Sequence, residues 1–370
     1  MDSVDEFAAI PDFHQASAEQ ARARQRSLTK PPGSLGRIEE LAVWYAGVRG
    51  RFPVAVPERG ELVVFAADHG VAAEGVSQYP AAVTAAMVEN FRAGGAAVCV
   101  LARQAGLGLT VVDVGVAGER FPPGPDPVDA GPASSNAATR FVDARIRPGS
   151  GNMYTGAAMS AAEVEQAIEV GRLQARSALA RGSEFLIGGE MGIGNSTAAA
   201  ALVSALGGVP PEEVVGHGTG IDAPTWRHKV AVVASSLERH RSLVGTPASP
   251  LGALAAVGGL EIAALAGLML EGAKARVPTI VDGFIAGAAA LVALRLAPAV
   301  RPFLLLSHLS AERGARRLAA LLGAPAPLLE LELRLGEGTG AVLAVPLLRA
   351  AVALQAQMAT FAEAAVPDRT

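Results

Sequence analysis

Short apolar runs that stop at polar residues or glycines recur along the chain. Residues 62–67 read LVVFAA and end at Asp68, and residues 185–187 lead into the glycine-rich sequence GGEMGIGN. Further runs of this kind lie at residues 109–112, 277–281, 303–306 and 329–335. A short continuous apolar run is typical of a strand that is buried on both faces. The pattern therefore predicts that each of these runs is a strand inside one sheet.

Segments with helical periodicity separate these runs. The predicted helices cover residues 13–49 with a break at TKPPGSLG, and then 80–104, 160–181, 196–206, 224–241, the stretch after Gly259, and 340–365. One of them begins with a capping box of Ser160 and Glu163, in which each side chain bonds the backbone of the other residue. Because strands and helices alternate, we expect an α/β fold with a doubly wound, mostly parallel sheet flanked by helices.

The two ends of the chain differ from its middle. Residues 1–50 and 341–370 are helical in pattern and contain no predicted strand, so we expect them to form a small helical subdomain. Residues 51–340 contain all the predicted strands and are expected to form the α/β catalytic domain. The apolar stretch 251–270 is interrupted by two glycines and a glutamate, which predicts a buried helix and no membrane partner.

The segment 185–200, FLIGGEMGIGNSTAAA, predicts a strand, a tight turn and a helix. Its glycines at 188, 189, 192 and 194 would let the backbone take positive φ and approach a ligand closely. The amides at the start of the helix, from Asn195 onward, would attract an anion such as a phosphate. We expect Glu190 inside this turn, so that one segment holds a phosphate and supplies a carboxylate. A purely structural glycine turn is the alternative.

Two other glycine-rich segments follow the same logic. LRLGEGTGA, at 333–341, places Glu337 between two glycines at the end of a predicted strand. GHGTGID, at 216–222, precedes a helix that carries Lys229, whose compact charge suits a phosphate. Taken alone, Lys229 would also fit a solvated surface position. Ligands of parallel sheets bind beyond the carboxyl ends of the strands, which is where these segments are predicted to lie.

Other polar residues near the predicted strand ends allow more than one interpretation. Ser77 and Tyr79 offer a hydroxyl and a flat ring for a planar apolar substrate, or belong to an ordinary loop. Ser310, in the sequence SHLSAE, either binds a ligand or caps a helix. His69 follows Asp68 without a second histidine at ligand spacing, so we expect no metal site.

Composition and charge restrict the class of protein. The net charge is −4 and no basic stripe with interleaved aromatic residues is present, so we expect no nucleic-acid partner. Cys99 is the only cysteine, which excludes an intrachain disulfide and suggests a buried structural thiol. The first residues lack a basic segment followed by an apolar run, which predicts a cytoplasmic protein.

An ordered set of segments links these features. They read TKPPGSLGRIEELA, ADHGVAAEGVSQYP, GGEMGIGNST, GHGTGID, GGLEIAALAG, VDGFIAGAAAL, SHLSAERG and LGEGTGA. Together they strongly resemble the nicotinate-nucleotide:dimethylbenzimidazole phosphoribosyltransferases, over about residues 25–350. The resemblance implies transfer of 5-phosphoribose from nicotinate mononucleotide to 5,6-dimethylbenzimidazole, giving α-ribazole 5′-phosphate and nicotinate for the nucleotide loop of cobalamin. It also implies a homodimer that works without a cofactor.

The resemblance assigns individual residues as well. Glu337 matches the general base of the family, and Glu190 matches a second active-site carboxylate. The residues predicted to bind the phosphate or nucleotide are Gly192, Ile193, Gly194, Asn195, Lys229, Ser310 and Gly338. The residues predicted to bind the base are Ser77, Tyr79, Met87 and Leu335. Ala85 and Ala86 stand where the family commonly has a Gln, and the loss of that amide leaves the preferred base open.

The chemistry of this transfer suits the residues. An unprotonated ring nitrogen of the benzimidazole attacks the anomeric carbon, the opposite N–H becomes acidic, and a carboxylate must accept the proton. The nicotinate leaves as a neutral ring, so neither an acid nor a metal is required. Three alternatives remain: the same fold acting on adenine or a phenolic compound, a nicotinamide-dependent oxidoreductase, and an inactive subunit of a hetero-oligomer. The glycine spacing, which is not GxGxxG, disfavours the oxidoreductase.

Overall fold

The computed structural model describes residues 10–122, 139–245, 249–323 and 325–367. Residues 1–9 and 368–370, which belong to the segments predicted to form the helical subdomain, lie outside these ranges.

In the described part of the chain, six strands form one sheet, and every neighbouring pair is parallel. They are β1 (Gly60–Ala67), β2 (Gly108–Gly115), β3 (Arg140–Asp143), β4 (Phe185–Met191), β5 (Thr279–Val281) and β6 (Leu304–Leu306). Their order is β3-β2-β1-β4-β5-β6, so the direction in which strands are added reverses between β1 and β4. This is a doubly wound α/β sheet, and the predicted fold class is confirmed.

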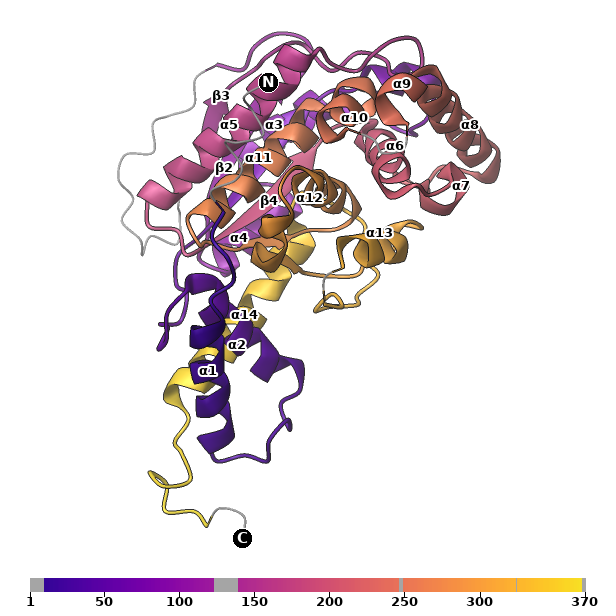
Figure 1. Cartoon of the computed structure of the whole chain (residues 1–370). Coiled ribbons are helices and arrows are strands. Elements are labelled where there is room, and N and C mark those ends of the chain that lie inside the picture. The colour runs from indigo at the N-terminus through magenta and orange to yellow at the C-terminus, as the bar shows by residue number, and fades with distance from the viewer. Residues whose placement is uncertain (1–9, 123–138, 246–248, 324, 368–370) are drawn as a thin grey trace.

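Helices connect the strands and cover both faces of the sheet (Figure 1). They are α1 (Gln15–Ser27), α2 (Arg37–Arg49), α3 (Val83–Arg92), α4 (Ala97–Gln104), α5 (Ala161–Ala180), α6 (Asn195–Gly207), α7 (Pro211–Val214), α8 (Ala223–Arg239), α9 (Arg241–Val244), α10 (Pro250–Val257), α11 (Leu260–Lys274), α12 (Phe284–Leu296), α13 (Ala315–Leu322) and α14 (Thr339–Gln357). The 3₁₀ helix η2 (Gly70–Glu74) follows β1, and the 3₁₀ helix η3 (Pro298–Phe303) precedes β6. The predicted capping box at the start of α5 is present.

Alternate residues of the central strands belong to two different apolar cores. On β1, Val63 and Phe65 point into the core formed with α5, α6, α10, α11 and α12. Leu62 and Val64 point into the core formed with α2, α3, α4 and α14. All eight residues of β1 are buried, which explains why its sequence is a continuous apolar run rather than an alternating one.

Two predictions about elements are wrong. Residues 329–335 form an extended loop instead of a strand, with one isolated bridge between His308 and Leu329. Leu331 and Leu335 of this loop are 55% and 58% exposed, whereas Leu329 packs against the core that contains β1. The predicted helix at 80–104 is divided into α3 and α4 by the turn around Gly94, where φ is 74°.

The short edge strand β3 was not predicted from the sequence. Its four residues, RFVD, are only partly buried or exposed, and their charged ends hide the apolar signal that marks the inner strands. Backbone pairing with β2, from Thr110 opposite Arg140 to Asp113 opposite Asp143, defines it.

The N-terminal helices α1 and α2 lie beside the long C-terminal helix α14, below the sheet in Figure 1. Gln25 of α1 donates a hydrogen bond to Gln355 of α14 at 3.1 Å, and Arg24 bonds the Met358 carbonyl at 2.8 Å. The other end of α14 shares its core with β1, through buried residues such as Val342 and Val345. The division into domains at residues 50 and 340 stays a prediction.

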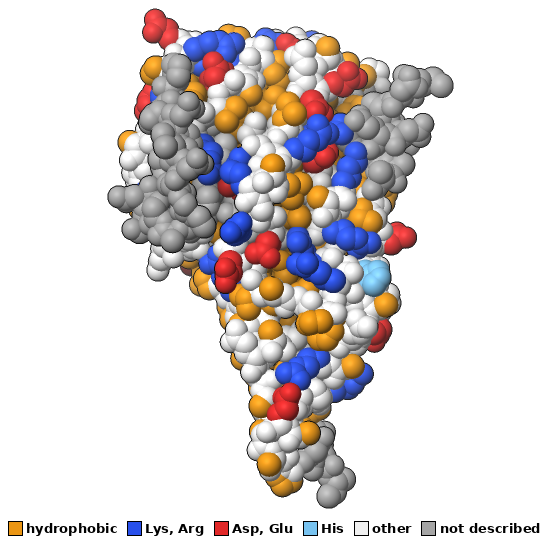
Figure 2. Space-filling view, turned by 90° about the vertical axis from the view of Figure 1, so that its left-hand side faces the viewer, with side chains coloured by type: hydrophobic (Ala, Val, Ile, Leu, Met, Phe, Trp, Pro, Cys, Tyr) orange, Lys and Arg blue, Asp and Glu red, His pale blue; other side chains and the backbone are white. Residues whose placement is uncertain are grey.

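Two helical stretches of the described residues, Val83–Gln104 and Thr339–Gln357, are apolar and long enough to cross a membrane by length and composition alone. The second is α14, whose apolar residues are accounted for by packing against β1 and α2. Figure 2 shows the side of the molecule that faces left in Figure 1, where basic, acidic and apolar side chains are interspersed.

Candidate active site

A cleft opens beyond the carboxyl ends of the strands, at the position that the topology of the sheet favours for a ligand. Its volume is about 580 Å³, within the range of roughly 300–1,000 Å³ that is usual for ligand pockets. Five of the residues predicted for the site line it, namely Tyr79, Glu190, Asn195, Ser310 and Leu335. These come from widely separated parts of the chain, so the fold creates the cleft.

Glu190 lies within β4, not in the turn where we expected it. The strand continues through Gly188, Gly189 and Glu190, with Glu190 opposite Phe65 of β1. Of the four glycines predicted to take positive φ, Gly194 does, at 99°. Gly188 and Gly189 serve a different purpose, because a Cβ atom would collide with Leu265 at the first and with the backbone of Glu337 at the second.

The carboxylate of Glu190 is buried and is held by two donors. The side-chain amide of Asn195, the first residue of α6, donates a hydrogen bond to it, and so does the backbone N–H of Glu337. Burial raises the pKa of Glu190 well above its ordinary value, and the nearby charges of Asp282, Glu261 and Glu337 raise it further.

Glu337 lies next to Glu190 in a strained turn. Its φ is 64°, between Gly336 at 83° and Gly338 at 92°, which is an uncommon conformation for a residue with a side chain. A Cβ atom at Gly336 would collide with the Glu190 carboxylate. The two carboxylates that the sequence singled out are therefore brought together, and the glycines around them permit the close approach.

Glu337 is not among the residues that line the cleft, and its side chain reaches the start of α4. It accepts a hydrogen bond from the backbone N–H of Val98, and its Oε2 is buried with no hydrogen-bond partner among the described residues. Burial, together with the charge of Asp282, raises the pKa of Glu337 to about 7. A carboxylate with this pKa can accept a proton near neutral pH.

Lys229 is buried beside the start of α6, so the solvated surface alternative is wrong. Its side chain is 1% exposed, and Nζ donates a hydrogen bond to Ser196 Oγ at 2.9 Å. Burial lowers the pKa of Lys229 to about 8, while the charge of Glu312 opposes this shift. Ser196 lines the cleft, so a cationic group lies directly behind the positive end of a helix. This combination favours an anion.

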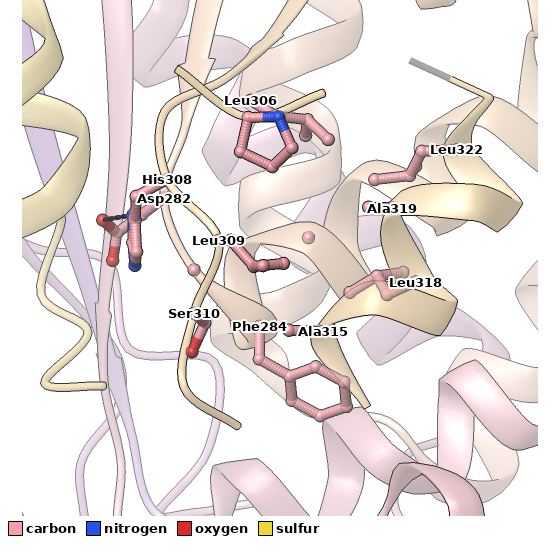
Figure 3. A pocket seen from close by; sticks show the side chains of 13 residues that line it. Asp282, Phe284, Leu306, His308, Leu309, Ser310, Ala315, Leu318, Ala319 and Leu322 are labelled. Carbon is pink, nitrogen blue, oxygen red and sulfur yellow. Dashed lines mark ion pairs between the residues drawn. The ribbon is translucent and has the colours of Figure 1, made fainter. Parts of the chain in front are cut away.

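Asp282 and His308 line the same cleft, and neither is among the site residues predicted from the sequence. Figure 3 shows them in a smaller pocket beside α13 that they also line. Asp282 follows β5 and accepts hydrogen bonds from the backbone N–H groups of Gly338 at 3.3 Å and Ala341 at 3.0 Å. His308 follows β6, and its Nδ1 lies 2.9 Å from Ser307 Oγ and 3.8 Å from Asp282 Oδ1. The sequence signal that could have identified both residues is their position directly after a predicted strand.

Burial controls the charges of this pair. It raises the pKa of Asp282, although the charge of His308 and three backbone N–H groups oppose the shift. It lowers the pKa of His308, which the charge of Asp282 opposes. Figure 3 shows Asp282 and His308 side by side, with Ser310 on the same segment as His308. Ser310 Oγ accepts the backbone N–H of Glu312 at 3.2 Å within a turn. The next helix, α13, begins at Ala315 after Gly314 without a side-chain cap, so the capping alternative is wrong, and Ser310 lines the cleft.

The remaining predicted residues lie around the cleft rather than in it. Gly192 and Ile193 form the turn after β4, and the backbone N–H of Ile193 donates to Thr84 Oγ1 at 3.1 Å. Ser77 Oγ lies 3.4 Å from Thr219 Oγ1 at the rim of the cleft. Met87 lies on α3 and packs against the core on that side of the sheet.

Two of the base-binding candidates are exposed. Tyr79 is 52% exposed and Leu335 is 58% exposed.

Across the described ranges, no group of three His, Cys, Asp or Glu side chains could hold a metal ion. Cys99 is buried on α4, with Sγ 3.6 Å from the Phe91 carbonyl, as expected for a structural thiol.

Fold and cleft define a doubly wound α/β protein with an anion site beside paired buried carboxylates. A family model described as Phosphoribosyltransferase matches residues 10–366, and the chain belongs to this family. A relative from Chromobacterium violaceum, named nicotinate-nucleotide–dimethylbenzimidazole phosphoribosyltransferase, is 51% identical over 95% of this chain and 96% of its own. A relative of the same name from Azotobacter vinelandii is 49% identical over 98% of this chain and 97% of its own.

Solved structures agree with these relatives. The crystal structure of CobT from Thermus thermophilus is 47% identical and has a TM-score of 0.88, covering 96% of this chain and 100% of that one. The resemblance found in the sequence is confirmed, and the chain is a phosphoribosyltransferase of this family.

Proposed function

We propose that this protein transfers 5-phosphoribose from nicotinate mononucleotide to 5,6-dimethylbenzimidazole, giving α-ribazole 5′-phosphate and nicotinate for cobalamin assembly. The names of relatives that are about half identical over nearly the whole chain support this activity. The structural observation that carries the proposal is the pairing of a buried base, Glu337 with a pKa of about 7, with the anion site at α6.

The phosphate of the nucleotide would bind at the start of α6. Lys229 supplies charge through Ser196, and the helix supplies oriented amides. The turn formed by Gly192, Ile193 and Gly194 shapes this site, while Asn195 connects it to Glu190. Ser310 approaches from the other side of the cleft, and Gly338 lets the Glu337 turn lie against β4.

The reaction forms one bond and breaks another at the anomeric carbon. A ring nitrogen of the base supplies the electron pair for the new bond, and the pair of the old bond leaves with the nicotinate nitrogen. The proton lost from the other ring nitrogen goes to Glu337, which must be ionised to receive it. Glu190 lies beside this turn, where its ionised form would stabilise positive charge that develops on the ribose.

The base would bind next to Glu337, between the turn that carries it and α3. Met87 on α3 and the exposed Tyr79, Ser77 and Leu335 are the side chains proposed to surround it. Because alanines occupy positions 85 and 86, recognition of the base would depend on apolar contact more than on a side-chain amide. Adenine or phenolic compounds are therefore included among the candidate bases to be tested.

We further propose a homodimer that acts in the cytoplasm. The apolar side chains exposed near the cleft, including Tyr79 and Leu335, are of the kind that a second subunit covers. Light scattering after size-exclusion chromatography measures the mass directly, and a mass of one chain at micromolar concentration would refute the dimer.

The decisive experiment is product analysis. The purified protein is incubated with nicotinate mononucleotide and, separately, 5,6-dimethylbenzimidazole, other benzimidazoles, adenine or phenol, and the products are identified by mass. We expect α-ribazole 5′-phosphate and free nicotinate with dimethylbenzimidazole. If no base receives phosphoribose, the proposal is wrong.

The oxidoreductase alternative gains no support from the topology. In dinucleotide-binding sheets the glycine fingerprint follows the first strand, whereas here β1 is followed by Asp68, His69 and Gly70 and the glycine-rich turn follows β4.

A further inference from the structure

A buried ion pair lies behind the turn after β4, and the mechanism above does not use it. His69 follows β1 directly, and Glu261 lies in the first turn of α11. His69 Nε2 and Glu261 Oε1 are 2.7 Å apart, and the two side chains are 1% and 0% exposed. Nδ1 of His69 has no hydrogen-bond partner among the described residues, so the bond to Glu261 is what fixes the orientation of the ring.

The imidazole of His69 packs against glycines on both sides. A Cβ atom at Gly192 would lie 3.3 Å from the ring, and one at Gly194 would lie 3.1 Å from His69 Cβ. On the other side, a Cβ atom at Gly259 would collide with the ring. The ring therefore fills the space between the 192–194 turn and the start of α11.

The surroundings of His69 favour its charged form. Burial disfavours that form, but Glu261 and Asp68 outweigh this effect and raise the pKa of His69 above its ordinary value. A hydrogen bond from a charged imidazole to a carboxyl oxygen is charge-assisted and directional. Glu261 also acts on Glu190 through its charge, so His69 offsets one of the acidic groups near the cleft.

We propose that His69 and Glu261 are positioning residues that hold the 192–194 turn in the shape that binds the phosphate of the nucleotide. This inference rests on the proposed function. The turn is continuous with α6, whose first residues line the cleft, so a shift of the turn moves the anion site. Breaking the pair should weaken nucleotide binding more than it slows the transfer.

The test compares variants of the full-length protein. In Glu261→Gln the ion pair is lost but the side-chain volume is kept. The double variant His69→Gln/Glu261→Gln leaves no unpaired buried charge, so it guards against a single variant that does not fold. We expect both to raise KM for nicotinate mononucleotide by about tenfold, with a change of about twofold or less in kcat and in KM for the base.

Glu271→Gln is the matched control. Glu271 lies ten residues further along α11, about 15 Å away along the helix, where it pairs with Arg172 and Arg176. This variant also breaks an ion pair of α11, and it should lower thermal stability without changing KM for the nucleotide. An equal rise of KM in Glu271→Gln would mean that any weakening of α11 has this effect, which would overturn the inference.

Calorimetric titration with nicotinate mononucleotide separates the possible failures. If the wild-type protein does not bind the nucleotide, the proposed function fails, and this inference fails with it. If the wild type binds and the folded double variant binds with the same affinity, the inference alone fails. Weaker binding by the Glu261 and double variants, with unchanged binding by the control, supports it.

Discussion

The two glycine-flanked glutamates of this protein share a sequence pattern but differ in structure. Glu190 lies in the regular strand β4 and receives hydrogen bonds from Asn195 and from the backbone of Glu337. Glu337 lies in a left-handed turn, and its Oε2 lacks a partner among the described residues. Both are 5% exposed, so burial alone does not distinguish them.

The difference is in the groups around each carboxylate. Glu190 is surrounded by three other acidic residues, and its pKa is raised well above the usual value. Burial and the charge of Asp282 raise the pKa of Glu337 to about 7. A group that exchanges its proton near neutral pH suits general base catalysis, whereas Glu190 is held in place by its donors. Neighbours, rather than the glycine pattern, thus separate the two functions.

The largest effect is expected from Glu337→Gln. The amide keeps the volume and an oxygen but cannot take a proton, so kcat should fall by ~10²–10⁴ with little change in either KM. Steady-state kinetics with both substrates and circular dichroism of the fold check this. A folded variant with near-wild-type kcat would remove Glu337 as the base. If Glu190 accepts the proton in its absence, the residual rate should vanish only in Glu190→Gln/Glu337→Gln, whereas a rate that depends on water should persist in the double variant.

The pH dependence of kcat should follow the ionisation of the Glu337 carboxyl group. Only its ionised form accepts a proton, and its pKa is about 7, so kcat should be constant above that pH and fall as the pH decreases. The fall should be about tenfold per pH unit. A pH series with saturating substrates measures this limb, and the residual rate of Glu337→Gln should lack it. A limb at the ordinary pKa of a glutamate would contradict the comparison.

Lys229→Ala should act on binding instead of proton transfer. A charge-assisted contact contributes about 1.5–3 kcal/mol, so KM for nicotinate mononucleotide should rise at least tenfold while kcat changes less. Since the pKa of Lys229 is about 8, wild-type KM should also rise above that pH as the ammonium loses its proton. An unchanged KM in the variant would place Lys229 outside the nucleotide site.

Glu190→Gln should have a smaller effect than Glu337→Gln. A neutral amide still receives hydrogen bonds but cannot ionise. Because the raised pKa of Glu190 already favours its uncharged form, we expect kcat to fall only about tenfold. The acid limb near pH 7 should remain, because Glu337 is intact. The limb is the sharper measurement: if it disappears in this variant, the two glutamates have been assigned in the wrong order.

The smallest effect is expected from removing metal ions. If the carboxylates act as proton groups, exhaustive dialysis against EDTA should leave kcat unchanged within about twofold. Loss of activity with EDTA and its return with Mg²⁺ or Zn²⁺ would mean that the paired carboxylates hold a metal.

The sequence predicted the inner strands because residues such as those of β1 are buried on both faces, and that burial leaves a direct signal in the chain. It also predicted that Glu190 and Glu337 would lie near one another. The loop at 329–335 was mistaken for a strand, since its leucines resemble a buried run until the missing neighbour is known. Strand registers and local φ values depend on contacts between distant residues, which is why Glu190 was misplaced.

Two residues of the cleft were missed in the sequence for the same reason. Asp282 and His308 each stand alone after a short strand, and they acquire meaning only when β5 and β6 lie side by side. The role of Lys229 in the site stays a prediction. Its burial follows from the packing of α8 on α6 and could not be distinguished from a surface position by the helix pattern alone.

The hydrogen bond between Thr84 and the Ile193 backbone has a practical consequence for altering the base preference of this enzyme. Thr84 lies in the first turn of α3, the helix that carries positions 85, 86 and 87, and Ile193 belongs to the turn proposed to receive the nucleotide. Substitutions that reshape α3 to admit a different base will therefore displace the phosphate-binding turn as well. Variants selected for a new base should be screened at several nucleotide concentrations, so that a weakened donor site is not misinterpreted as poor recognition of the acceptor.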